Sequence, residues 1–313
     1  MSNRRDRFRT AFGCALVLAV GAAVFPTGAM AQRPPGQANN PSFGPIKVTK
    51  ITPTVYFVQG GVHGNNGNSG VIIGNHGVIV IDAKLNADGA KLMLDAIHQI
   101  TPKPVTDLIF THSHLDHVGG AAAFPRGITI IAHENAKAEI EKAIAAGGPR
   151  APPREAIPTQ VVHGSGTTLT IQGVRLRLIH VAPAHTTGDL AIWLPAQRIL
   201  FAGDLMATTL KRPLVCAECT VEGYIRFYKV LTALGAKTVV TGHGTLVTNA
   251  ELEQRAKEVS NAYGKVKALV AQGKSLQDVE RAMGDRPSEA GPGGAFRIPP
   301  FSEVIYKELT RNK

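Results

Sequence analysis

One ten-residue stretch, THSHLDHVGG at residues 111–120, constrains the fold of this chain more than any other feature of the sequence. It places His112, His114, Asp116 and His117 within six positions, directly after the apolar segment VTDLIF, which predicts a β-strand. Imidazole nitrogens and a carboxylate are typical ligands of a borderline divalent metal such as zinc. One tetrahedral metal cannot take all four groups from so short a loop, so the spacing predicts a site for two adjacent metals.

Three further candidate ligands lie far along the chain, each next to an apolar segment. His185 in APAHTTGDL precedes the segment LAIWLP, Asp204 ends RILFAGD, and His243 ends VVTGH. Each is flanked by glycine or other small residues, which let the backbone bring a ligand close. A single residue of this kind is more often structural, but the ordered set of strand ends predicts one composite site.

The pattern of apolar residues predicts an α/β fold with two similar halves. Runs rich in Val and Ile alternate with helical segments in the order strands, helix, strand, helix, and this order then repeats. The clearest helix is NADGAKLMLDAIHQI, where Met93, Ile97 and Ile100 share one face. The expected strands cover residues 47–60, 69–75, 77–83, 105–111, 128–133, 167–173, 174–181, 190–195, 198–204 and 237–244.

The first 31 residues predict a secretory signal peptide. A basic segment, MSNRRDRFR, precedes an apolar run that is short for a membrane span, and small residues at Ala29 and Ala31 suit cleavage after Ala31. A membrane anchor is the alternative. Residues 32–45 are rich in Pro, Asn and Gly and predict a flexible leader. We therefore expect a periplasmic or secreted protein without a membrane span after cleavage.

Charge and cysteine content narrow the possible partners. The formal net charge is +11, but the basic residues are scattered, with few aromatic residues among them, which favours a solvated surface over a nucleic-acid track. We expect a small-molecule substrate and no nucleic acid, and the oligomeric state is open. Cys216 and Cys219 would remain after cleavage, either as a short disulfide of an oxidising compartment or as two thiols in a loop.

The motifs VIVIDA, THSHLDH, APAHTTGDL, ILFAGD and VVTGHG occur in this order between about Ile46 and Gly244. In this respect the chain resembles the metallo-β-lactamase superfamily. The resemblance implies a four-layer αβ/βα sandwich, which we place at residues 46–248. Residues 249–313 are mostly helical by pattern, and we expect them to form a C-terminal helical extension of the same domain.

The same resemblance implies the roles of the candidate site residues. Asp204 would bridge two zinc ions, and Asp116 would also orient the attacking hydroxide as a catalytic group. Asp82, which ends VIVID, would support the metal loop without being a ligand, and His63 in the loop GGVHGNNGN is a candidate substrate contact or a solvated loop histidine. The implied ligands are His112, His114 and His185 for one zinc, and Asp116, His117 and His243 for the other.

These features together predict a metal-dependent hydrolase with two zinc ions, acting on an ester-, lactone-, thioester- or amide-type substrate. A β-lactamase is one alternative, but zinc β-lactamases with this strand pattern usually carry Cys in place of Asp204 and lack His117. An iron-dependent oxidoreductase similar to persulfide dioxygenases is another alternative, because that class keeps a similar histidine set. The intact ligand set argues against a non-catalytic binding protein.

Overall fold

The structure, a computed structural model, describes residues 45–60, 67–210, 213, 219–285, 289–290 and 297–311. All of these belong to one compact unit, Pro41–Lys313. The expected signal peptide, nearly all of the expected leader, His63 and Cys216 lie outside the described residues. Within the described part of the chain, no helix is both long and apolar enough to cross a membrane.

The first sheet contains seven strands among the described residues, and they are paired in chain order. Its first half is antiparallel, and from β4 onward the strands are parallel, with α1 (Ala87–Ile100) and α3 (Glu134–Ala146) in the crossovers. The Asn86 side chain caps α1 by accepting the Gly89 amide. The strands are β1 (Lys47–Lys50), β2 (Val55–Gln59), β3 (Ser69–Ile73), β4 (Val78–Ile81), β5 (Val105–Ile109), β6 (Thr129–His133) and β7 (Gln160–Val162).

The second sheet repeats this plan with five strands in the described part of the chain, in the order β12-β11-β10-β9-β8. Strands β8 to β11 are antiparallel, and β11 and β12 are parallel, with α4 (Val221–Thr232) between them. The two halves predicted from the sequence are therefore present. The strands are β8 (Gly166–Ile171), β9 (Val174–Ile179), β10 (Ala191–Leu194), β11 (Ile199–Ala207) and β12 (Thr238–His243).

Alternation of side chains along the strands produces four layers. In β4, Ile79 belongs to the core between the two sheets, whereas Val80 packs with Met93 of α1 on the outer face. In β10, Ile192 joins the core between the sheets and Trp193 packs toward the helices of the other side. The resulting αβ/βα sandwich confirms the fold class predicted from the sequence.

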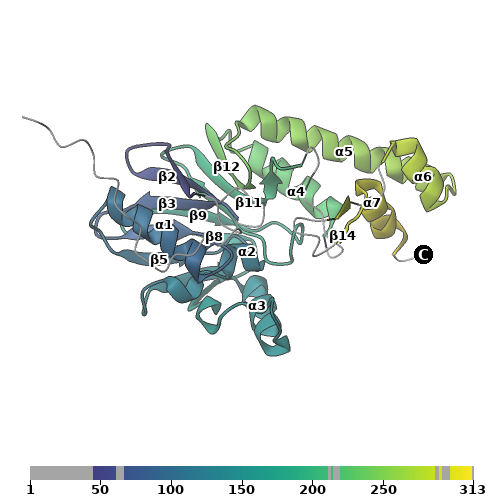
Figure 1. The fold of residues 1–313 in the computed structure, drawn as a ribbon. Coiled ribbons are helices and arrows are strands. Elements are labelled where there is room, and N and C mark those ends of the chain that lie inside the picture. Colours follow the sequence, from purple (N-terminus) through teal and green to yellow (C-terminus); the bar gives the residue numbers. More distant parts are fainter. Residues whose placement is uncertain are drawn as a thin grey trace, which may run out of the picture. The chain divides into compact units, whose positions relative to one another are not determined.

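Helix α4 and the long helix that follows β12 lie over the outer face of the second sheet, and the later C-terminal helices pack against these two (Figure 1). Helix α5 (Asn249–Ala271) begins at a capping box, in which Thr248 and Glu251 bond each other's backbone amides. The remaining elements are α6 (Leu276–Met283), the short strands β13 (Glu289–Ala290) and β14 (Arg297–Ile298), and α7 (Phe301–Thr310).

The local structure differs from the sequence prediction in several places. Strand β7 was not expected, and three further differences concern expected strands or site residues. Residues 47–60 form a hairpin of two strands instead of one continuous strand, because the chain turns between β1 and β2. Asp204 lies inside β11, which continues to Ala207. Asp116 lies on the one-turn helix α2 (Leu115–Val118), so it does not continue the alternation of an extended strand.

Candidate metal centre

The structure brings all seven predicted ligand residues together, although they come from both sheets. His112 and His114 follow β5, Asp116 and His117 lie on α2, His185 lies between β9 and β10, and Asp204 and His243 belong to β11 and β12. Their side chains form two clusters of possible metal ligands. The first cluster is His112, His114, His185 and Asp204, and the second cluster is Asp116, His117 and His243.

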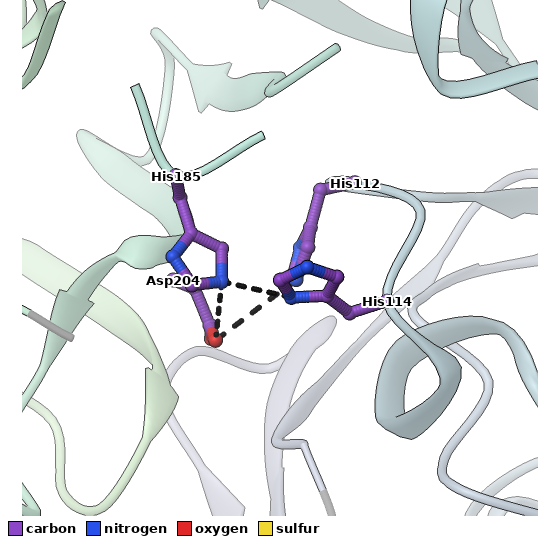
Figure 2. A group of neighbouring side chains, drawn as sticks. All are labelled: His112, His114, His185 and Asp204. Carbon is purple, nitrogen blue, oxygen red and sulfur yellow. Dashed lines mark hydrogen bonds and ion pairs between the residues drawn. The ribbon is translucent and has the colours of Figure 1, made fainter. Parts of the chain in front are cut away.

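In the first cluster, three imidazoles and one carboxylate point toward a common centre (Figure 2). His185 Nε2 lies 2.9 Å from His114 Nδ1 and 3.2 Å from Asp204 Oδ2. His112 Nε2 lies 3.9 Å from the same Asp204 oxygen. The cluster is buried except at His114, which is partly exposed.

In the second cluster, His243 Nε2 lies 3.0 Å from Asp116 Oδ2 and 3.4 Å from His117 Nε2. The carboxylate of Asp204 reaches this cluster as well, because Oδ2 lies 3.3 Å from His243 Nε2 and Oδ1 lies 3.3 Å from His117 Nε2. The carboxylate of Asp204 therefore contacts histidines of both clusters.

Two observations show that these residues suit bound metal ions. Among the described residues, His112 Nε2 and Asp204 Oδ1 are buried polar atoms without a hydrogen bond, although burying a polar atom unpaired is costly. Ligand atoms about 2.0–2.1 Å from a tetrahedral zinc ion lie about 3.3 Å from each other. The nitrogen and oxygen atoms named above are separated by 2.9 to 3.9 Å, which brackets that value.

A bulge in β11 places Asp204 at the centre. The pairing of β11 with β12 shifts register on both sides of Gly203, which has a φ of +51°. A bulge re-aims the side chain that follows it, and glycine adopts this backbone conformation without steric cost. The bulge explains how an aspartate in the middle of a buried strand faces the histidines of the other sheet.

The buried carboxylate of Asp82 fixes the orientation of two of the imidazoles. Its Oδ2 accepts a hydrogen bond from the Thr111 hydroxyl at 2.7 Å and lies 2.8 Å from His117 Nδ1. Because the Thr111 hydroxyl gives its one proton to Asp82, it can only accept from His112 Nδ1, 3.0 Å away. Both rings then hold their protons on Nδ1 and present Nε2 to the centre. Asp82 supports the ligands without joining them.

We expect Asp82→Asn to weaken metal binding by about 10–100-fold, as is usual when an outer-shell partner of a ligand is lost. The amide cannot accept bonds from Thr111 and His117 at both positions, so His117 loses the partner that fixes its proton on Nδ1. Competition with a chromophoric chelator measures the change. The control is Asp107→Asn, the same substitution at a buried aspartate of β5 that contacts Thr106 and Gln172. Equal affinities for the two variants would contradict the role of Asp82.

Tyr224 of α4 and Asp189 hold His185 in the same way. The Tyr224 hydroxyl lies 3.0 Å from His185 Nδ1 and donates to the carbonyl oxygen of Asp204 at 3.4 Å, which leaves His185 Nε2 as the inward nitrogen. The Asp189 carboxylate accepts the backbone amides of Ala184, His185 and Thr186. Burial raises the pKa of Asp189 to about 6 although His185 and these amides oppose the shift.

The pKa shifts divide the centre into two parts. Burial, together with neighbouring histidines, holds the pKa of His112 well below its ordinary value and lowers that of His114 to about 4. These imidazoles are therefore neutral at pH 7, which is the state a metal requires.

Burial also lowers the pKa of the histidines in the second cluster, but the neighbouring carboxylates raise it by more. Asp204 and Asp116 raise the pKa of His243 to about 9, and Asp204, Asp116 and Asp82 hold that of His117 well above its ordinary value. The histidines in turn lower the pKa of Asp116 to about 2 against the effect of burial. A metal ion binding at the second cluster would therefore release protons from these histidines.

Several supporting residues were not recognised in the sequence. Thr111, Tyr224 and Asp189 contact the ligands directly or hold their backbone. Cys219 also packs here, with Sγ 3.8 Å from His185 Nδ1, and it is disulfide-bonded to a partner outside the described residues. The segment HTTGD, which begins at His185, was visible in the sequence. Its aspartate, Asp189, was a signal that a side chain accepts the backbone amides of this loop.

The fold and the two clusters define an αβ/βα sandwich protein with a candidate metal centre. The family model of the metallo-beta-lactamase superfamily matches residues 63–243, which span both clusters. The chain therefore belongs to the metallo-beta-lactamase superfamily, and it carries a His/Asp centre whose residues could hold metal ions.

Relatives within this family act on different substrates. The chain is 33% identical over 139 residues to the 2,4-dinitroanisole O-demethylase subunit alpha of Nocardioides sp. (strain JS1661). The aligned region covers 44% of this chain and 40% of the subunit. It is 25% identical over 256 residues to a metallo-beta-lactamase type 2 of Bacteroides fragilis, covering 77% of this chain and 93% of the enzyme. The chain thus spans less than half of the first relative and most of the second.

A solved structure shows the same fold. The stereoselective inverting sec-alkylsulfatase Pisa1 from Pseudomonas sp. superposes with a TM-score of 0.66 at 17% identity, covering 86% of this chain and 51% of the sulfatase. At this identity the similarity concerns the fold alone.

Proposed function

We propose that this protein is a binuclear zinc hydrolase that attacks an ester-, lactone-, thioester- or amide-type bond. The observation that carries the proposal is the position of Asp204, whose carboxylate Oδ2 lies 3.2 Å from the inward nitrogen of His185 and 3.3 Å from that of His243. The other oxygen, Oδ1, lies 3.3 Å from Nε2 of His117. A carboxylate shared by two imidazole clusters is suited to bridging two cations. Two zinc ions bound there would lower the pKa of a shared water toward neutrality and polarise the bond that it attacks.

Two aspartates of the centre have different roles in this proposal, Asp204 in holding the clusters together and Asp116 in positioning water. Asp204 is 2% exposed at its side chain and serves to hold the two clusters together. Asp116 is 25% exposed and is ionised, so it can orient a water molecule from the open side and accept its proton at the carboxylate.

The carboxylate at position 204 and the imidazole at position 117 favour this proposal over a β-lactamase. Both side chains are buried and lie 3.3 Å apart at the junction of the clusters. The relative from Bacteroides fragilis makes ring opening of a β-lactam the second candidate, because that similarity extends over most of both chains.

Metal analysis combined with a substrate panel tests the proposal. The purified protein is loaded with zinc, its metal content is measured, and hydrolysis is assayed on a lactone, a thioester, a carboxylic ester, a β-lactam, an alkyl sulfate and an aryl methyl ether. We expect two zinc ions per chain and the highest kcat/KM on the lactone, thioester or ester. Preferred cleavage of the sulfate, the ether or the β-lactam would show that the proposed substrate class is wrong. Fewer than two zinc ions per chain would show that the centre is not binuclear. Oxygen consumption with bound iron would select the oxidoreductase instead.

We also propose that the protein acts in the periplasm or outside the cell. The basic and apolar segments before Ala31 support export, and the disulfide at Cys219 suits an oxidising compartment. Mass spectrometry of the protein recovered from periplasm and medium tests this, with a mature N-terminus at Gln32 as the expected result.

A further inference from the structure

Gly67 and Asn68, directly before β3, connect the two backbone segments that carry the ligands of the second cluster, α2 and the end of β12. The Gly67 amide donates to the carbonyl oxygen of Asp116 at 3.2 Å, and the Asn68 amide donates to the carbonyl oxygen of Gly242 at 2.7 Å. This 67–68 segment is therefore bonded at one end to a ligand of the second cluster and at the other end to the residue before His243.

The Asn68 side chain makes further hydrogen bonds to the backbone around His243, at the end of β12. Its Nδ2 donates to the carbonyl oxygens of Thr241 at 2.9 Å and Gly244 at 3.2 Å, one on each side of His243. Its Oδ1 accepts the Gly60 amide at 3.3 Å. Asn68 is only 4% exposed. If its side chain were removed, these carbonyl groups would lose a hydrogen-bond donor that water could not easily replace.

A buried lysine holds the 67–68 segment from the opposite side. Lys84 is fully buried, and its Nζ donates to the carbonyl oxygens of Gly67 and Val58, each at 2.9 Å. Gly67 itself has no room for a side chain, because a Cβ atom would lie 2.5 Å from Cε1 of His117. The segment is thus fitted between the His117 ring and the Lys84 ammonium group, which leaves it little freedom to move.

We propose that Asn68 is a positioning residue for the second cluster. By tying the backbone around His243 to the backbone of Asp116, it sets the separation of their ligand atoms and thereby the affinity of this cluster for its metal. The inference rests on the proposed binuclear function. Because Asn68 bonds the loops of the second cluster, its loss acts on one of the two metals, whereas a general loss of stability would weaken both.

Stepwise zinc titration in competition with a chromophoric chelator separates the two dissociation constants. For Asn68→Ala we expect one dissociation constant to rise about 10–100-fold, the range for outer-shell partners, and the other to stay unchanged. The reference variant His243→Ala identifies the affected site, since it removes a ligand of the second cluster. The constant raised in Asn68→Ala must be the one that is lost in His243→Ala.

Matched variants keep the test decisive. Asn249→Ala removes the same side chain at the start of α5, where Nδ2 donates to the carbonyl oxygen of Thr232 at 3.2 Å, and should change neither constant. Asn68→Ser, a smaller change, should give an intermediate rise. Lys84→Met removes the support from the other side of the 67–68 segment and should weaken the same site, which provides a result if Asn68→Ala does not fold.

The outcomes distinguish this inference from the function on which it rests. Two zinc sites in the wild type with an unchanged pair of constants in Asn68→Ala would overturn the inference and leave the binuclear function intact. An equal rise of both constants would also overturn it, because that pattern indicates a general structural role. Fewer than two zinc sites in the wild type would overturn the proposed function itself and the inference with it.

Discussion

Asp204→Ala is expected to give the largest loss of activity, because the Asp204 carboxylate contacts histidines of both clusters. Without its carboxylate, His185 and His243 lose the oxygen that lies 3.2 and 3.3 Å from their inward nitrogens. We expect zinc content to fall from two ions to one or none, and kcat/KM to fall by more than the roughly 100-fold seen for outer-shell partners. Metal analysis of the purified variant and the assay on its best substrate measure both quantities.

Asp204→Asn is the matched variant, since it keeps the shape and one ligand oxygen but removes the negative charge. An intermediate loss is expected for it. Circular dichroism shows whether each variant is folded, so that a loss of structure is not counted as a loss of ligand. Two zinc ions and unchanged kcat/KM in Asp204→Ala would show that the bridging assignment is wrong.

Removal of the metals by a chelator is expected to abolish hydrolysis and to lower Tm. The ligands come from β5, β11 and β12 and so from both sheets, and a bound metal ties these sheets together only in the native state. At a metal concentration 100 times Kd, each ion contributes about 2.7 kcal/mol. For a domain of this size, that corresponds to a fall of about 5–10 °C per ion.

Thermal unfolding with and without the chelator, followed by readdition of zinc, provides the measurement. Activity and Tm should both return with zinc. Asp204→Ala serves as the control, because a variant that holds less metal should show a smaller change in Tm. Hydrolysis that persists after the metal content has fallen to background would rule out a metal-dependent reaction.

The sequence was sufficient to predict the fold class and the set of candidate ligands, for reasons that lie in particular residues. Strand β4 is the apolar run VIVI between Gly77 and Asp82, and β10 is the apolar run AIWL before Pro195, so their positions could be recognised locally. His112, His114, Asp116 and His117 lie within one loop, and a motif of this density is visible without any structure.

The supporting residues could not be predicted in this way. Asn68 and His243 are 175 positions apart, and an isolated Asn in a glycine-rich segment is typical of a turn. Lys84 would ordinarily be expected at the surface, since lysine is seldom fully buried. The contacts of Tyr224 depend on how α4 packs on β11, which no local pattern of the sequence specifies.

The bulge at Gly203 misled the sequence interpretation for a different reason. An apolar run followed by Gly and Asp is usually the end of a strand, but here β11 continues for three residues beyond Asp204. The extension is buried because α4 covers it, with Tyr228 donating to the carbonyl oxygen of Leu205 at 2.7 Å. Only the packing of the helix on the sheet makes a strand of this length favourable.

The guanidinium group of Arg255 shows what the last third of the chain contributes to the centre. It reaches from α5 to the carbonyl oxygens of Ala207 at 3.4 Å and Leu210 at 3.1 Å, where the backbone leaves β11. A helix that contributes none of the candidate ligands therefore supports the end of the strand that carries Asp204. Evolutionary change on the solvent-facing side of α5 would leave the chemistry unaffected, whereas a change on the side that bears Arg255 would reach the metal ligands through the backbone.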